Sequence, residues 1–222
     1  MAVDTEFLKS ISYFAGLSAD ELESIREIVL EKKADRREII LYEGEPAEAI
    51  YFVVSGALKL FRTSVDGKEQ ILSILRPGDS FNDVPVFDDG PNPASVETMT
   101  PVLLYELSKS DFNALLENNP AVTANTVHVL AGKVRQLVDL VEDLSFRHVI
   151  GRVARILLEH TDGEGSGPHL TQQDMAAMAG TAREVVGRSL KALEEEGIIR
   201  FNRHRIVIVD RKALHEKVES PL

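Results

Sequence analysis

The sequence predicts an α+β protein in three parts: a β-rich domain over residues 1–119, a long helix over 120–146, and a mainly helical domain over 147–222. Short β-rich segments separated by glycine turns fill the first part. A heptad repeat runs through the second, and two short helices joined by a glycine lie in the third. The 222 residues are 44% hydrophobic and 27% charged, a composition that can bury a core.

The composition excludes several classes of site. The chain has no cysteine, so disulfides, thiolate zinc sites and cysteine-ligated iron–sulfur clusters are ruled out. The acidic start lacks the apolar segment of a secretory signal, and no apolar run reaches the ~18–20 residues of a membrane span. We therefore expect a cytoplasmic protein that does not enter a membrane.

The negative charge is concentrated in the first part of the chain. The formal net charge is −11 at pH 7. Residues 1–119 hold 11 basic and 22 acidic side chains, whereas residues 145–222 hold 12 basic and 11 acidic ones. This asymmetry suggests two modules with different partners.

The first domain begins with a helical pattern over residues 6–34, in which Ser18 and Glu21 form a capping box. The β-rich runs that follow lie at residues 39–42, 50–54, 57–62, 70–75 and 102–107. Their close spacing indicates a small β-sandwich or barrel. Residues 80–99 contain three prolines and one glycine. We expect a long irregular loop with a functional role there, and no regular central strand.

A long helix begins at Pro120 and carries a strict heptad repeat. Valine occupies every a position and leucine every d position, at Val127, Leu130, Val134, Leu137, Val141 and Leu144. β-branched residues at a with leucine at d favour a parallel two-stranded coiled coil. The alternative is an amphipathic helix buried in its own domain. We expect this seam to pair two copies of the chain in a homodimer.

Residues 170–193 have the pattern of a helix, a tight turn and a second helix. Thr171 with Asp174 resembles a capping box, and Gly180 is placed to end the first helix in a left-handed conformation. Thr181 with Glu184 is placed to cap the second helix.

The second helix presents Arg183, Glu184 and Arg188 on its outward side. Arginine can bind guanine O6 and N7 together, and glutamate can accept a hydrogen bond from the cytosine amino group. Two β-rich runs, at 198–201 and 205–209, follow as a basic hairpin wing. The wing arginines, which suit DNA phosphates, are Arg200, Arg203 and Arg205. Together these features predict sequence-specific binding of double-stranded DNA.

The chain resembles the cyclic-AMP receptor/fumarate–nitrate regulator (Crp/Fnr) superfamily of bacterial transcription regulators over essentially its whole length. The segment Arg183-Glu-Val-Val-Gly-Arg188 is close to the recognition-helix pattern Arg-Glu-x-Val-Gly-Arg, and residues 143–158 match the family's hinge and following helix. The resemblance implies an N-terminal β-roll of the cyclic-nucleotide-binding jelly-roll type, a dimerisation helix and a C-terminal winged helix-turn-helix. It also implies a TGTGA-like inverted repeat as the DNA site and RNA polymerase as a partner. The phosphate contacts that it implies are Thr171, Gln173 and Thr181.

In family members that bind cyclic AMP, a Gly-Glu pair holds the ribose and an Arg-Ser pair holds the cyclic phosphate. The irregular loop aligns Asn82-Asp83 with the first pair and Pro93-Ala94 with the second. The phosphate would therefore lack its cation and its hydroxyl, at a cost of several kcal/mol. We do not expect cyclic AMP to be the effector, and a cyclic-nucleotide-responsive regulator is kept as an alternative.

A second pair of residues also argues against cyclic AMP. In family members that bind it, a Thr-Ser pair of the dimerisation helix contacts the base, and this pair aligns with Leu137-Val138, whose side chains cannot form hydrogen bonds. Two interpretations stay open: an unidentified neutral or apolar effector, or a pocket filled by its own side chains. The candidate pocket residues are Asn82, Asp83, Val84, Pro93, Ala94, Leu137 and Val138.

No resident metal or cofactor is expected. All six histidines lie after residue 119, so a haem-responsive regulator is an alternative that we do not favour. The sequence lacks HExxH, GxSxG and Walker A motifs and a cysteine nucleophile, so we do not expect an enzyme. A further alternative is an interaction module whose C-terminal domain contacts protein and not DNA.

Overall fold

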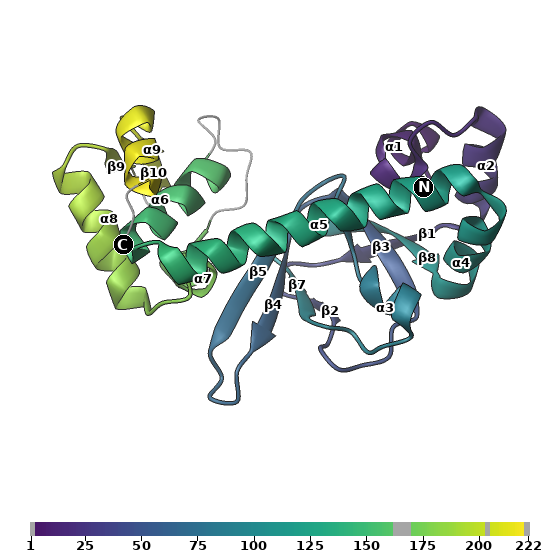
Figure 1. Ribbon diagram of the computed structural model, residues 1–222, viewed down its shortest axis with the longest axis horizontal. Coiled ribbons are helices and arrows are strands. Elements are labelled where there is room, and N and C mark those ends of the chain that lie inside the picture. The colour runs from purple at the N-terminus through teal and green to yellow at the C-terminus, as the bar shows by residue number, and fades with distance from the viewer. Residues whose placement is uncertain (1–2, 162–169, 203–204, 220–222) are drawn as a thin grey trace. The chain divides into compact units, whose positions relative to one another are not determined.

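The computed structural model describes residues 3–161, 170–202 and 205–219 (Figure 1). These residues form two compact units. The first consists of residues 1–62 and 73–135, and the second of residues 63–72 and 136–222. The long helix α5 (Pro120–Phe146) contributes to both units.

The first unit opens with three short helices: α1 (Thr5–Ser10), a 3₁₀ turn (Ser12–Phe14) and α2 (Ala19–Ile28). The Ser18–Glu21 capping box at the start of α2 is confirmed. The helical pattern expected up to residue 34 was wrong at its end, because residues 30–34 form strand β1. The backbone turns extended at Val29, and β1 pairs with a strand more than 60 residues further along the chain.

Eight strands in two four-stranded sheets make up the roll that the sequence predicts, with orders β1-β8-β3-β6 and β2-β7-β4-β5. The neighbours β1–β8, β8–β3, β3–β6, β2–β7 and β7–β4 pair antiparallel. The strands are β1 (Leu30–Ala34), β2 (Ile39–Leu41), β3 (Ala49–Ser55), β4 (Leu58–Thr63), β5 (Glu69–Leu75), β6 (Ser80–Phe81), β7 (Ser95–Thr98) and β8 (Val102–Ser108).

The segment 80–99 is more regular than expected. It holds β6, the short helix α3 (Val84–Asp88) and β7. Strand β7 lies between β2 and β4, so the expectation of no regular central strand was wrong. The three prolines of the segment all precede residue 95, which leaves every backbone N–H of β7 free to join the ladder.

Strand β3 separates two hydrophobic cores by alternation of its side chains. Ile50 and Phe52 pack with the helices, including Phe112 of α4 (Lys109–Asn118). Tyr51 and Val53 pack on the opposite face, in the core that both sheets share. Because the strand is buried on both faces, it reads as a continuous apolar run.

The second unit contains the winged helix-turn-helix. Its elements are α6 (Val149–His160), α7 (Gln172–Ala179), α8 (Arg183–Glu195), β9 (Ile199–Asn202), β10 (Arg205–Ile208) and α9 (Arg211–Glu219). Gly180 ends α7 with a φ of 61°, as predicted. The core of this unit joins Val153, Met175, Leu190 and Leu214. Among the described helices, none is long and apolar enough to cross a bilayer.

Candidate DNA interface and effector cassette

A capping box fixes the start of α7. The Thr171 hydroxyl accepts a hydrogen bond from the Asp174 backbone N–H at 3.1 Å and donates to the Asp174 carboxylate at 2.7 Å. The Thr171 backbone N–H donates to the same carboxylate at 2.8 Å. Both donors of Thr171 are therefore engaged inside the chain.

The start of α8 differs from the prediction. Its N-cap is Ala182, which has no side chain to cap the helix, so the predicted cap by Thr181 was wrong. The backbone N–H of Thr181 donates to the Ala176 carbonyl at 3.0 Å and so belongs to the end of α7. Thr181 therefore belongs to the turn that closes the first helix, and the second helix begins two residues later, at Arg183.

The three predicted base-reading residues stand on the exposed side of α8. Arg183 and Glu184 are the first two residues of the helix, and Arg188 lies one turn further on. All three are exposed, and within the described part of the chain none of their side chains has an ion-pair or hydrogen-bond partner. The opposite side of α8 is buried through Val186 and Leu190. The helix thus holds these polar groups outward at its N-terminal end, the end that contacts base edges in helix-turn-helix proteins.

The predicted phosphate contacts have different surroundings. Gln173 is exposed on the first turn of α7, whereas Thr181 is half-buried. On the wing, Arg200 and Arg205 are exposed and lie on adjacent antiparallel strands. Arg203 lies outside the described residues. Sequence reasoning did not single out Lys191, which follows Arg188 by three residues on α8 and forms an exposed ion pair with Glu195 at 3.6 Å.

The heptad seam of α5 is open to solvent in the single chain. Val127, Val134 and Val141 are 63%, 58% and 63% exposed. Leu137 and Leu144 are 53% and 38% exposed, and Leu130 is half-buried. The alternative of a helix buried in its own domain does not fit these values. An apolar stripe of this length on one helix is typical of an interaction surface.

The segment of residues 80–99, called the cassette from here on, holds a buried carboxylate that is already paired with a cation. Asp83 is 4% exposed, and its carboxylate accepts hydrogen bonds from the Tyr13 hydroxyl and the Lys133 ammonium group. Lys133 also donates to the Ser80 carbonyl at 2.8 Å and to the Ser80 hydroxyl at 3.0 Å. Burial and the nearby Asp83 charge raise the pKa of Tyr13 well above its usual value. Neither Tyr13 nor Lys133 was found from the sequence, because both lie at least 50 residues from Asp83.

The backbone of the cassette is also held in place. Asn82 adopts a left-handed conformation with a φ of 65°, and its side-chain amide donates to the Ala49 carbonyl at 2.9 Å. At the other end of α3, Lys109 donates to the Pro85 carbonyl at 3.0 Å and pairs with Asp89 at 2.6 Å. This contact lowers the pKa of Asp89 below its usual value.

The remaining candidate pocket residues differ in how exposed they are. Val84 is 50% exposed, Pro93 is exposed, and Ala94 is 3% exposed. Leu137 and Val138 belong to the second unit. The structure therefore describes only the side of the predicted pocket that the roll forms.

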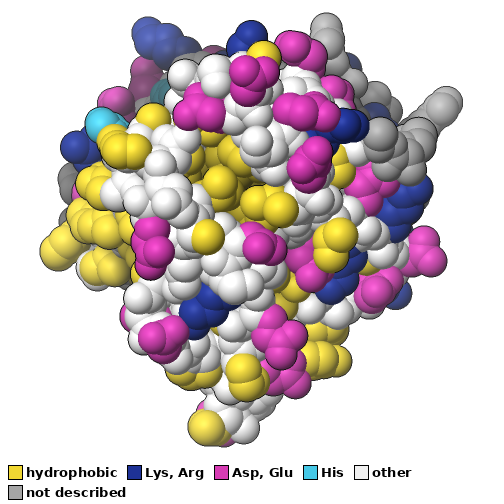
Figure 2. Space-filling model, turned by 90° about the vertical axis from the view of Figure 1, so that its right-hand side faces the viewer, with side chains coloured by type: hydrophobic (Ala, Val, Ile, Leu, Met, Phe, Trp, Pro, Cys, Tyr) yellow, Lys and Arg dark blue, Asp and Glu magenta, His cyan; other side chains and the backbone are white. Residues whose placement is uncertain are grey.

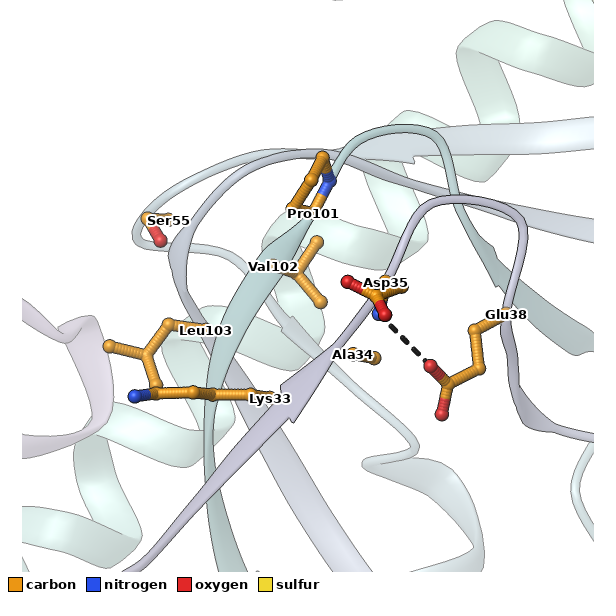
Figure 3. Close-up of a pocket in the computed structure, with 8 residues that line it drawn as sticks. All are labelled: Lys33, Ala34, Asp35, Glu38, Ser55, Pro101, Val102 and Leu103. Atoms are coloured by element: carbon orange, nitrogen blue, oxygen red, sulfur yellow. Dashed lines mark hydrogen bonds between the residues drawn. The ribbon is translucent and has the colours of Figure 1, made fainter.

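A cavity of about 390 Å³ lies elsewhere on the roll, beside β1 and β8 (Figure 3). Its lining contains none of the predicted effector residues, and the Asp35 backbone N–H donates to the Glu38 carboxylate at its rim, at 2.9 Å. The lining residues are Lys33, Ala34, Asp35, Glu38, Ser55, Pro101, Val102 and Leu103. No cluster of three or more His, Asp or Glu side chains able to hold a metal ion occurs in residues 3–161, 170–202 and 205–219.

The charge on the helical end of the first unit argues against DNA binding there. Figure 2 views the molecule from the end that carries α1, α2 and α4, and acidic side chains are spread over this face around an apolar hollow. Such a surface repels a phosphate backbone. This face of the first unit is therefore unsuited to binding DNA.

Comparison with known proteins assigns both parts of the chain. Residues 31–119 match the cyclic nucleotide-binding domain, and residues 151–217 match the Crp-like helix-turn-helix domain. The chain is 32% identical to the cyclic AMP receptor protein of Thermus thermophilus over 211 residues, which cover 94% of this chain and 97% of that protein. It is 28% identical to a CRP-like cAMP-activated global transcriptional regulator of Mycobacterium tuberculosis, with the same coverage of 94% and 97%.

Among solved structures, FixK2 from Bradyrhizobium japonicum superposes with a TM-score of 0.77 at 27% identity, covering 87% of this chain and 98% of that one. The fold of this chain is thus shared with that structure over 87% of the chain. The protein belongs to the Crp/Fnr family of transcription regulators.

Proposed function

We propose that this chain is a homodimeric transcription regulator that binds double-stranded DNA at an inverted repeat of TGTGA-like half-sites and works without cyclic AMP. One observation carries the DNA part. Arg183, Glu184 and Arg188 are exposed along one side of α8, and no described side chain competes for them. Arginine pairs with guanine and glutamate with cytosine in the major groove, so these groups suit the G·C pairs of such a half-site.

The dimer is supported by the exposed seam of α5. Its valines and leucines are spaced to meet the same residues of a second copy in a parallel coiled coil. Each such side chain contributes about 1.5–3 kcal/mol when it is fully buried. Pairing through α5 would place two recognition helices in one particle, as an inverted repeat requires.

The cassette supports independence from cyclic AMP. The Asp83 carboxylate is engaged by Tyr13 and Lys133, and Pro93-Ala94 supplies neither a cation nor a hydroxyl for a phosphate. The effector is then an unidentified neutral or apolar molecule, or no effector is needed. A cyclic-nucleotide-responsive regulator is the second candidate. The match to the cyclic nucleotide-binding domain and the names of the Thermus and Mycobacterium relatives favour it.

A haem-responsive regulator and a protein-binding module have less support. Haem would need ligands in the roll, where the sequence places no histidine. A module that contacts only protein would leave the exposed arginines of α8 without a role. We further propose that the regulator acts in the cytoplasm and contacts RNA polymerase. Membership of a family of transcription regulators supports both points.

Fluorescence anisotropy tests the proposal. Protein freed of small molecules is titrated at about 0.1 M salt onto a TGTGA-N6-TCACA duplex and onto a scrambled duplex, with and without cyclic AMP. Specific binding without any addition is the expected result. Specific binding only with cyclic AMP would establish the second candidate and contradict our interpretation of Pro93-Ala94.

Two variants separate base reading from phosphate contact. Arg188→Ala is expected to lower the affinity for the TGTGA duplex by about 5- to 150-fold and to remove discrimination against a mutated half-site guanine. Arg200→Ala is expected to weaken binding to every duplex alike and to flatten the salt dependence. An Arg188→Ala protein that still discriminates the guanine would contradict the assignment of base-reading residues.

A further inference from the structure

A cluster of charged side chains at the junction between α5 and α6 takes no part in the DNA interface described above. Asp143, near the end of α5, has a side chain that is only 14% exposed. Its two carboxylate oxygens pair with different arginines, Arg147 at 2.5 Å and Arg155 of α6 at 2.7 Å. One half-buried carboxylate therefore joins the end of α5, the linking residues and α6.

Arg147 extends this connection to the last helix of the chain. Its guanidinium group also donates to the backbone carbonyl of Val218, in the last turn of α9. The last carbonyls of a helix have no partner within the helix and favour a cation. Helix α9 in turn lies tightly against α6, because a Cβ added at Gly151 would lie 2.9 Å from the Lys217 carbonyl oxygen.

Arg152 connects the same junction to the turn of the helix-turn-helix. Its Nε donates at 2.8 Å to the carbonyl of Ala179, the residue before the left-handed Gly180. Its Nη1 donates at 2.6 Å to the backbone carbonyl of Arg147. By contrast, His148 at the N-cap of α6 makes no side-chain hydrogen bond that would fix the junction locally.

We propose that Arg147 is a positioning residue for DNA recognition. With Asp143 and Arg152 it fixes the angle between the end of the dimerisation helix and α8, and so sets which half-site spacing a dimer accepts. This inference rests on the proposed binding to an inverted repeat. Each added base pair between half-sites turns one of them by about 35° around the DNA axis. A fixed junction therefore accepts one spacing, and a loose junction accepts several.

A distance measurement tests the junction without DNA. The chain has no cysteine, so spin labels can be placed at Asp139→Cys on α5 and Glu195→Cys on α8, both exposed positions. Labelled protein is mixed with an excess of unlabelled protein, so that only distances within one chain are recorded. Arg147→Met is expected to widen the distance distribution at least about twofold. Arg135→Met, an exposed arginine on the same helix, is the matched control and should leave it unchanged.

A spacer series then tests the consequence for recognition. The parent protein should prefer one spacing over duplexes one base pair shorter or longer by at least about tenfold, and Arg147→Met should reduce that preference to about threefold or less. Arg147→Lys keeps the charge but loses the two-sided guanidinium, so it should fall between the two. A lower melting temperature with both the distance distribution and the spacing preference intact would show a merely structural role and overturn the inference. Absence of specific binding by the parent would instead contradict the proposed function, and the distance measurement would still decide the role of Arg147 in the junction.

Discussion

Removal of Lys133, the residue of α5 that pairs with Asp83 in the cassette, is the sharpest test of how the roll is held together. In Lys133→Met the Asp83 carboxylate stays buried, with the Tyr13 hydroxyl as its remaining side-chain donor. Loss of one partner from a fully buried ion pair costs about 3–5 kcal/mol. The Lys133 side chain is 32% exposed, so water already screens part of the pair. We expect the free energy of unfolding to fall by about 2–3 kcal/mol.

Urea unfolding followed by tyrosine fluorescence measures this loss of stability in the first unit, which contains Lys133 and Asp83. The protein has no tryptophan and four tyrosines, and all four lie in the first unit. The double variant Lys133→Met/Asp83→Asn should recover part of the loss, because no unpaired charge is then buried. A change below about 0.5 kcal/mol in Lys133→Met would refute the reasoning, since it would place the variant among ordinary surface substitutions.

Three further outcomes are expected. First, burial and the neighbouring Glu106 raise the pKa of Tyr51 to about 12 from 10.0. The contribution of Tyr51 to the free energy of unfolding is therefore fully present below pH 10.0 and is lost as the pH rises toward 12, and Tyr51→Phe should remove this part of the pH dependence in urea titrations at each pH. Second, Ala182→Ser should stabilise the second unit by about 0.5–2 kcal/mol in thermal unfolding, because the N-cap of α8 has no side-chain acceptor; an unchanged melting temperature would contradict the cap geometry. Third, Val134→Lys should convert the dimer to monomer in analytical ultracentrifugation, whereas the exposed Arg135→Met on the same helix should not; a dimeric Val134→Lys would exclude the seam.

Local patterns predicted the elements that local chemistry determines. The heptad of α5, the capping boxes at Ser18 and Thr171 and the left-handed Gly180 each depend on residues within one or two turns, and the structure confirms the helix, the two caps and the turn. Residues 30–34 were misassigned because their conformation is set by pairing with β8, a partner that periodicity within the segment cannot reveal.

The parts of the site that were missed depend on contacts across long stretches of chain. Asp83 was singled out as the counterpart of a ribose-binding residue, but its partners Lys133 and Tyr13 lie 50 and 70 residues away. A charged residue in a heptad reads as solvated unless the fold places a carboxylate beside it. The same holds for Arg147, whose role depends on the end of α9, 71 residues further along the chain.

The left-handed backbone at Asn82 bears on how ligand dependence changes within this fold. Asparagine is one of the few residues that adopts this conformation at low cost, and glycine adopts it freely. The main chain at this position therefore has a conformation that a glycine would also adopt freely. If the regulator works without cyclic AMP, the difference lies in a few side chains, such as Ala94 and Lys133, and not in the course of the backbone. A few substitutions would then convert a regulator that needs a ligand into one that does not, or the reverse.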